Sequence, residues 1–332
     1  MVLSRDRTGA LRALIVGTGS IGRRHIANLR ALRPEVQLAF LRDGAREDDF
    51  SREAGAEVFG DISGALAWAP DIAIVATPSD RHHELLAPLL EHKVATFVEK
   101  PVVTALAQVE ALEGLLAADE GPPTQTGCVL RFLPAVRTLR RWLDKGRAGT
   151  VVRTSFECGQ YLPDWRPGQD YRHSYSADGA RGGGVIFDLV HELDLALYLL
   201  DDVELLHAAA ARRSHLELAC EDTAVILLRS AGGVPVSVSL DYVSRQPVRR
   251  IDIVGDAATL RLDFVAKRLE FISARGEGEF HEGFDVDAAY REELEELLAA
   301  REQGGATSLP IKEGLRSTRL AIAARAMAGL TP

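Results

Sequence analysis

A chain of 332 residues is longer than one ordinary hydrophobic core, so its length predicts two domains. Hydrophobic residues make up 46% of the chain and charged residues 26%, which is typical of a soluble globular protein. The formal net charge of −9 disfavours binding to nucleic acid or to an anionic membrane, and we expect neither partner. These properties together indicate a small-molecule ligand.

The cysteines and the first residues indicate a reducing compartment. Cys128, Cys158 and Cys220 are far apart, which suits neither a disulfide framework nor a zinc cluster. Residues 1–7 lack the apolar core of a signal peptide, and no stretch of the sequence reaches the roughly 20 apolar residues that cross a bilayer. We therefore expect a cytoplasmic protein.

The first part of the chain alternates between strand and helix patterns, as a doubly wound α/β domain does. Short apolar runs predict buried strands, and apolar residues three and four positions apart predict helices. We expect strands at 11–16, 36–41, 71–76, 94–98 and 124–130, and helices at 21–32, 80–92 and 102–116. This pattern predicts a doubly wound sheet over residues 1–130.

The second part of the chain, residues 131–332, has many strand patterns and few helix patterns. We expect strands at 150–158, 204–211, 223–229, 234–241, 249–254, 259–264 and 268–272, and helices at 185–200, 285–301 and 311–327. This order predicts an α+β domain with a large, mostly antiparallel open sheet. Helices would cover one face, so we expect a homodimer or homotetramer through the other face.

A glycine-rich turn, Gly17-Thr18-Gly19-Ser20-Ile21-Gly22, follows the first predicted strand and opens the first predicted helix. Gly17 allows the tight turn, Gly19 lets the backbone approach a pyrophosphate, and Gly22 lets the helix pack against the strand. The helix N-terminus, capped by Ser20, offers N–H groups to the phosphates. A turn without a ligand is the alternative, but the strand–turn–helix context predicts a bound dinucleotide.

Residues near this turn bear on the choice of dinucleotide. Arg23 or Arg24 can add a cation for the phosphates. Asp43, at the end of the second strand, would bind the ribose hydroxyls and favour NAD, whereas Arg42 would favour NADP. The turn Thr77-Pro78-Ser79-Asp80 is expected beside the nicotinamide ribose, or only as a helix start. We expect NAD or NADP, with NAD slightly favoured.

A lysine follows the strand predicted at 94–98, in Glu99-Lys100-Pro101. Lys100 would lie on the same rim of the sheet as the cofactor, where desolvation and a cationic nicotinamide lower a lysine pKa enough for proton transfer. Pro101 stiffens the position, and Glu99 would pair with Lys100 or face a helix end. The alternative is a surface lysine after an edge strand.

A second group of candidate residues follows three glycines, 182–184. Asp188, His191 and Glu192 are spaced i, i+3 and i+4 in an apolar run, which predicts one shared helix face. His191 is the natural general base near neutral pH, with Asp188 or Asp194 to orient it. A helix-start acidic turn with a structural histidine is the alternative. The spacing lacks the paired histidines of a helical zinc site, so we expect no metal.

The segment from Tyr161 to Arg172 is dense in aromatic residues, arginines and turn residues. Aromatic rings suit stacking on a sugar or base, and arginine suits a carboxylate or phosphate. Such a long non-periodic stretch is often functional, and the alternative is an arm that packs against another subunit.

Together these motifs resemble the Gfo/Idh/MocA family of NAD(P)-dependent oxidoreductases, and the resemblance covers nearly the whole chain. It includes the glycine turn, Ala76-Thr77-Pro78 with His82 following, Glu99-Lys100-Pro101, the triple glycine and Glu313-Gly314-Leu315. The resemblance implies an N-terminal Rossmann domain, a C-terminal domain with an open sheet, and usually dimers or tetramers. Family members mostly oxidise or reduce ring hydroxyls of sugars, nucleotide sugars or inositols.

The resemblance places Lys100 at the family's catalytic lysine, and His191 and Asp194 at its His-x-x-Asp motif. One departure concerns the preceding aspartate, which the family has four residues before the histidine. Asp188 stands three residues before His191, which leaves open whether Asp188 or Glu192 assists the histidine. The loop at 165–168 looks similar to members associated with bacterial surface-sugar biosynthesis, including nonulosonic acids.

The sequence therefore predicts hydride transfer between a nicotinamide and a ring hydroxyl or keto group, catalysed by Lys100, His191 and Asp188. The expected cofactor-binding residues are Gly17, Gly19, Ser20, Ile21, Gly22, Arg24, Arg42, Asp43, Thr77, Pro78, His82, Glu99 and Lys100. The expected substrate-binding residues are Lys100, Tyr161, Trp165, Arg166, Tyr171, Asp188 and His191. The alternatives are a redox-neutral glycosidase of the same family and a non-catalytic protein that binds dinucleotide or sugar.

Overall fold

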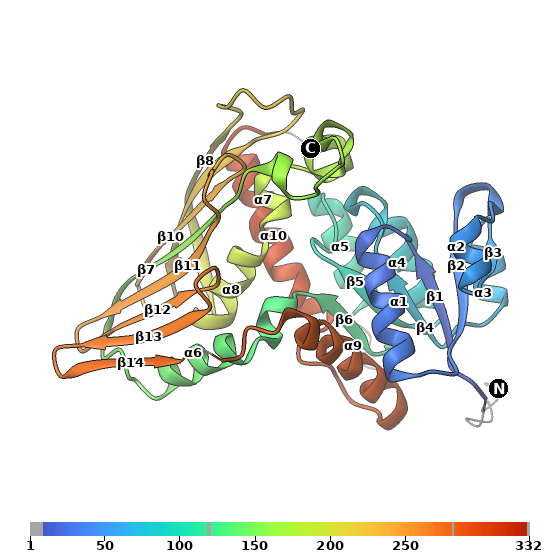
Figure 1. Ribbon diagram of the computed structural model, residues 1–332, viewed down its shortest axis with the longest axis horizontal. Coiled ribbons are helices and arrows are strands. Elements are labelled where there is room, and N and C mark those ends of the chain that lie inside the picture. The colour runs from blue at the N-terminus through green and yellow to red at the C-terminus, as the bar shows by residue number, and fades with distance from the viewer. Residues whose placement is uncertain (1–8, 118–120, 281, 331–332) are drawn as a thin grey trace. The chain divides into compact units, whose positions relative to one another are not determined.

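The computed structural model describes residues 9–117, 121–280 and 282–330 (Figure 1). The segment 1–7, on which the expected localisation partly rests, lies outside the described residues. The chain folds into two compact units, each built from more than one stretch. The first unit contains the chain up to Glu99 with 112–127 and 290–311, and the second contains 100–111, 128–289 and the chain from Lys312.

The first unit is built on a six-stranded parallel sheet in the order β3-β2-β1-β4-β5-β6. β1 is central and almost entirely buried, with Leu14 opposite Ala39 on one side and Ala73 on the other. Apolar runs buried on both faces are typical of parallel sheets, so this doubly wound sheet confirms the expected fold. The strands are β1 (Arg12–Val16), β2 (Gln37–Leu41), β3 (Glu57–Phe59), β4 (Ile72–Val75), β5 (Ala95–Glu99) and β6 (Thr124–Gly127).

A helix from near the C-terminus completes the core of this unit. Leu294, Leu297 and Leu298 of α9 are fully buried in one cluster with Ile26 and Leu29 of α1 and with sheet residues. The order of the elements along the sequence does not predict that α9 packs in the core of the first unit. The helices of this part of the chain are α1 (Ser20–Leu32), α2 (Asp49–Glu53), α3 (Ile62–Ala67), α4 (His82–Glu91), α5 (Leu106–Leu115) and α9 (Val286–Gln303).

The second unit contains an eight-stranded sheet in the order β14-β13-β12-β11-β7-β10-β9-β8. Only the β7–β10 pair is parallel among its paired strands, which confirms the expected mostly antiparallel sheet. The helices α6, α7, α8 and α10 lie against one face of the sheet (Figure 1). The strands are β7 (Val151–Gly159), β8 (Val203–Ala211), β9 (Thr223–Ser230), β10 (Pro235–Asp241), β11 (Val248–Gly255), β12 (Thr259–Asp263), β13 (Arg268–Ser273) and β14 (Gly276–Phe280).

Several expectations about the elements need correction. The helix expected at 102–116 spans only Leu106–Leu115, and β3, α2, α3 and β14 were not predicted. The single helix predicted at 185–200 is wrong, because α7 (Val185–Asp188) and α8 (His191–Leu200) are separate helices. The strand predicted at 124–130 ends at Gly127, and a 3₁₀ turn over Val129–Phe132 follows. The prediction missed α6 (Pro134–Asp144), although a proline in the first turn is a helix-start signal. The last helix, α10 (Ile311–Met327), has the bounds that were expected.

Within the described residues, no helix has both the length and the apolar character that crossing a membrane requires.

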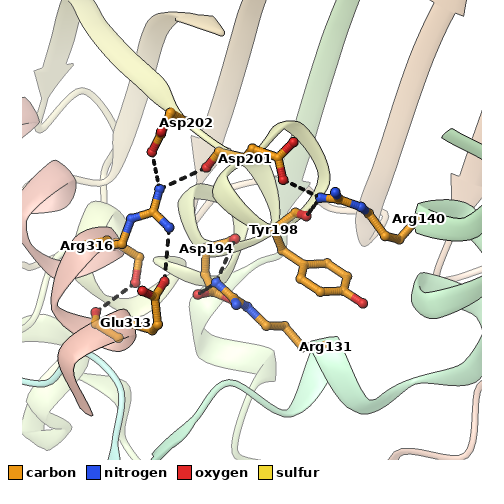
Figure 2. A network of polar contacts seen from close by, with 10 residues as sticks. Arg131, Arg140, Asp194, Tyr198, Asp201, Asp202, Glu313 and Arg316 are labelled. Atoms are coloured by element: carbon orange, nitrogen blue, oxygen red, sulfur yellow. Dashed lines mark hydrogen bonds and ion pairs between the residues drawn. The ribbon is translucent and has the colours of Figure 1, made fainter. Parts of the chain in front are cut away.

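A buried ion pair at the first turn of α8 and a more exposed one at its last turn hold the helix in place. Arg131 donates two hydrogen bonds of 2.7 Å to the carboxylate of Asp194, which is 1% exposed (Figure 2). At the other end of the helix, Arg140 bonds the carbonyl of Tyr198 and the carboxylate of Asp201 (Figure 2). Planar, bidentate arginine–carboxylate contacts fix orientation as well as distance. The helix therefore presents its first residue in a defined position.

A second buried pair fixes the start of α7. Arg325 of α10 bonds both carboxylate oxygens of Glu221 at 2.6 Å, and both side chains are almost fully buried. The Glu221 carbonyl also accepts the N–H of Val185. Gly184 has a φ of +107°, and a Cβ there would lie 2.5 Å from the Glu221 carboxylate oxygens. Only glycine therefore fits before α7.

We predict that Arg325→Met destabilises the second unit by about 3–5 kcal/mol, because it leaves Glu221 buried without its partner. Chemical denaturation followed by circular dichroism measures this change. Arg275→Met, at an exposed turn, is the matched control and is expected to change the free energy of unfolding by less than about 0.5 kcal/mol. A loss below about 1 kcal/mol for Arg325→Met would show that the pair does not hold this turn.

Candidate functional site

The glycine turn has the geometry that a dinucleotide needs. Gly17 has a φ of +98°, and a Cβ there would lie 2.5 Å from the carbonyl of Ala76. A Cβ at Gly22 would lie 1.9 Å from the Gly17 carbonyl oxygen, so α1 can pack this close only with glycine. A Cβ at Gly19 would meet nothing within 4 Å, so the space beside this backbone is open.

The N-terminus of α1 is free to face an anion. Gly19 is the N-cap residue, and no side chain caps the helix. Ser20 is the first helical residue, so the expected capping by Ser20 is wrong, and Ile21 follows it in the first turn. The open space at Gly19, the uncapped N–H groups and the helix dipole fit a pyrophosphate.

Arg42 and Asp43, which bear on the choice between NAD and NADP, both have partners after β2. Arg42 donates to the Thr18 hydroxyl at 2.9 Å and contacts the Asp48 carboxylate at 2.7 Å. The hydrogen bond from Arg42 is the main cause that lowers the pKa of Asp48 to about 2. Asp43 accepts from Arg81 at 3.1 and 3.2 Å on the surface. Arg42 thus lies beside the glycine turn, and the preference for NAD stays a prediction.

The turn after β4 is held by a histidine. His82 is fully buried, and its Nε2 lies 3.0 Å from the carbonyl oxygen of Thr77, which Pro78 follows. The Thr77 hydroxyl is buried without a hydrogen-bond partner among the described residues. The contact between the buried His82 side chain and the Thr77 carbonyl therefore helps to fix the conformation of this turn.

Arg24, another expected cofactor-binding residue, lies over the ring of Tyr290, 4.7 Å from its centroid.

Glu99 ends β5 and pairs with a buried histidine. Its carboxylate lies 2.7 Å from Nε2 of His25, which is fully buried. A Cβ at Gly127, the opposite residue of β6, would lie 3.0 Å from the same carboxylate. Glu99 is thus turned toward the sheet. The next residue along the chain, Lys100, begins the second unit.

Lys100 and Tyr242 both bind Asp188, at the end of α7. The Lys100 ammonium donates to the Asp188 carbonyl oxygen at 2.7 Å. The hydroxyl of Tyr242 donates to the Asp188 carboxylate at 2.7 Å. Burial and the neighbouring carboxylate raise the pKa of Tyr242 well above its usual value of 10, so this hydroxyl stays protonated and donating. Asp188 thereby fixes the positions of the Lys100 amine and the Tyr242 hydroxyl.

His191 begins α8, three residues after Asp188. Burial is the main cause that lowers its pKa well below the ordinary 6.5, and the positive charges of Lys100 and Arg249 lower it further. The imidazole is therefore neutral at pH 7 and able to accept a proton. Its Nδ1 is buried and bonds no group in the described part of the chain. Lys100, which bonds Asp188 three residues before His191, lies near enough for its charge to act on this imidazole.

The acids near His191 have other partners. Glu192 pairs with Arg249 at 2.7 Å, Asp194 pairs with Arg131, and Asp188 binds Tyr242. The predicted shared helix face is absent, because the helix is interrupted between α7, which ends at Asp188, and α8, which begins at His191. Within the described ranges, no group of three or more histidine, cysteine or acidic side chains is placed to hold a metal ion.

The sequence analysis missed Tyr242, which is fully buried beside the predicted site. The ring of Trp165 packs edge-on against it, with centroids 5.4 Å apart. A tyrosine at the end of an expected strand gives no local signal of this role. Tyr242 links the predicted substrate segment at 161–172 to Asp188.

The other predicted substrate residues lie in that segment. Tyr161 lies under the guanidinium of Arg245, 3.6 Å from its ring centroid, and its hydroxyl is 3.3 Å from Nε2 of His215. The hydroxyl of Tyr171 accepts the N–H of Glu217 at 3.1 Å. Arg166 and Tyr171 line one pocket with a volume of about 310 Å³.

We predict that Gly19→Ala lowers the affinity for NAD⁺ or NADP⁺ by about tenfold or more, while the free energy of unfolding falls by no more than about 1 kcal/mol, the cost of alanine at an N-cap. The added methyl group meets no protein atom and fills the open space at the helix N-terminus. Cofactor fluorescence titration and chemical denaturation give the two values. Gly114→Ala, with equally open surroundings in α5, is the control. Unchanged cofactor affinity in Gly19→Ala would place the phosphates elsewhere.

Comparison with known proteins gives matches in both parts of the chain. Residues 11–121 match the model described as oxidoreductase family, NAD-binding Rossmann fold, and residues 136–261 match the GFO/IDH/MocA C-terminal domain. The scyllo-inositol 2-dehydrogenase (NAD(+)) of Bacillus subtilis is 28% identical over 57% of this chain, and the match spans 54% of that relative. The putative UDP-kanosamine synthase oxidoreductase subunit of Amycolatopsis mediterranei is 30% identical over 76% of this chain and 75% of its own.

A solved structure shares the fold over the whole chain. An oxidoreductase from Agrobacterium radiobacter, crystallised with NAD⁺, L-tartaric acid and magnesium, matches with a TM-score of 0.82 at 23% identity. The match covers 97% of each chain. The doubly wound sheet with its glycine turn, the mostly antiparallel second sheet and these matches agree on one assignment. The chain belongs to the Gfo/Idh/MocA family of oxidoreductases, with an NAD-binding Rossmann domain.

Proposed function

We propose that the protein is an NAD(P)-dependent dehydrogenase or reductase that acts on a ring hydroxyl or keto group of a sugar, nucleotide sugar or polyol. The observations that carry the proposal are that Lys100 donates to the Asp188 carbonyl oxygen, and that its charge helps to lower the pKa of the buried His191 three residues further along the chain. An amine that holds an oxygen and an imidazole that accepts its proton are the groups that oxidation of an alcohol requires.

Each group has a defined task in this proposal. The nicotinamide, when bound, supplies the hydride acceptor. His191 takes the hydroxyl proton in the direction of oxidation and returns it to the oxygen in the direction of reduction. Lys100 donates a hydrogen bond to the same oxygen and stabilises negative charge that develops there. Asp188 fixes the amine through its carbonyl oxygen, and Tyr242 fixes Asp188.

The relatives support the breadth of substrates named here. One relative is named for scyllo-inositol and another, a putative subunit, for UDP-kanosamine, so the names of similar proteins include both a polyol and a UDP-linked compound. A place in surface-polysaccharide or nonulosonic acid biosynthesis stays a prediction. A homo-oligomer through the large sheet and a cytoplasmic location also stay predictions.

We predict that Lys100→Met and His191→Asn each lower kcat by about 10²-fold or more, because each removes a group that contacts the reacting oxygen. Affinity for the cofactor is expected to stay within about twofold, since neither residue shapes the glycine turn. A panel of sugars, nucleotide sugars and inositols with NAD⁺ and NADP⁺ identifies a substrate first, by absorbance at the nicotinamide band.

Lys312→Met and His92→Asn remove exposed residues of the same types and serve as controls. Turnover near that of the wild type in both Lys100→Met and His191→Asn would overturn the assignment. Product formation without net reduction of the cofactor would indicate the redox-neutral alternative instead. Binding without turnover of any panel member would indicate a binding protein.

A further inference from the structure

The pocket in the segment after β7 is built by this segment alone. Two short 3₁₀ turns, at Leu162–Asp164 and Tyr171–His173, form its walls. Its volume of about 310 Å³ is in the usual range for small-molecule pockets. The lining residues are Leu162, Pro163, Arg166, Gln169, Asp170, Tyr171, His173 and Ser174.

Arg166 brings a positive charge to this pocket that no carboxylate of the described residues neutralises. Its guanidinium lies 5.4 Å from the ring centroid of Tyr175, and it forms no ion pair or hydrogen bond with any described residue. The acid in the lining, Asp170, is already paired, because the guanidinium of Arg172 donates three hydrogen bonds of 2.7 to 3.0 Å to it and the backbone N–H of Arg172 donates a fourth at 3.0 Å. These bonds lower the pKa of Asp170 to about 2. The charge of Arg166 is thus available to a ligand.

The pocket is connected to the proposed catalytic residues through Tyr242. The N–H of Leu162, in the pocket wall, donates to the carbonyl oxygen of Tyr242 at 2.9 Å. Trp165, next to Arg166, packs edge-on against the ring of Tyr242. The hydroxyl of Tyr242 binds Asp188, which also holds Lys100. The Nε1 of Trp165 is buried and bonds no group of the described chain.

We propose that this pocket binds an anionic group of the substrate, a carboxylate or a phosphate, through Arg166. Guanidinium groups recognise both anions with two parallel hydrogen bonds. The inference rests on the proposed function and narrows it, because it makes the substrate an acidic or phosphorylated sugar rather than a neutral polyol. A pocket of this size, whose wall bonds Tyr242 and through it Asp188, would hold such a substituent while the ring hydroxyl reacts.

The test compares matched neutral and anionic probes. The probes are glucose, myo-inositol, glucuronate, glucose 6-phosphate and UDP-glucose, each added to the cofactor-loaded protein. Calorimetry measures binding, and nicotinamide absorbance measures turnover separately. Arg166→Gln removes the charge, Arg166→Lys keeps a charge without the planar fork, and Arg275→Gln removes an exposed arginine elsewhere in the same unit.

We expect at least one anionic probe to bind about tenfold or more tightly than its neutral counterpart. Arg166→Gln is expected to weaken that binding by about tenfold to a hundredfold, the range for hydrogen bonds to charged groups, while neutral probes change less than about twofold. Arg166→Lys should recover part of the loss, and Arg275→Gln should match the wild type. The comparison of glucuronate with the two phosphates shows which anion the pocket takes.

Two results would overturn the inference. Neutral probes that bind as tightly as every anionic probe would show that the pocket does not select for charge. Selectivity for an anion that persists in Arg166→Gln would place its site elsewhere. Charge-dependent binding that is lost in Arg166→Gln supports the pocket even if no probe is turned over. Absent turnover across the panel would then count against the proposed function alone.

Discussion

Asp188 ends α7, where the helical backbone is interrupted before α8, and two side chains from distant parts of the chain bond to it. Its carbonyl oxygen accepts from Lys100, and its carboxylate accepts from Tyr242. A carbonyl at the end of a short helix is free to accept such a bond because no following turn uses it. The helix break therefore supplies the acceptor that holds the lysine beside His191.

Buried charges at the edges of this arrangement keep it in place. The Arg325–Glu221 pair fixes the glycine turn before α7, and the Glu192–Arg249 and Arg131–Asp194 pairs fix α8 after the break. Such pairs add orientation more than net stability, because desolvation of the charges offsets most of their attraction. Their positive members also act on the site, since Arg249 helps to keep His191 neutral.

Local sequence patterns predicted the elements that carry the candidate functional residues. They did not predict contacts between residues that are far apart in the chain. The strand–glycine–helix turn and the lysine after β5 depend on neighbours in sequence, so their positions were predictable. The break before His191 was not, because Leu189 and Val190 continue the apolar pattern of a helix. Tyr242 and the return of α9 to the first sheet depend on residues far apart in the chain.

The central claim is that the amine of Lys100 and the imidazole of His191 share one site. Nuclear magnetic resonance of histidine-labelled protein, with His191→Asn for assignment, measures the pKa of this imidazole directly. We expect a pKa well below 6.5 in the wild type and a rise in Lys100→Met, because loss of the positive charge favours protonation. A pKa near 6.5 that does not change in Lys100→Met would contradict it.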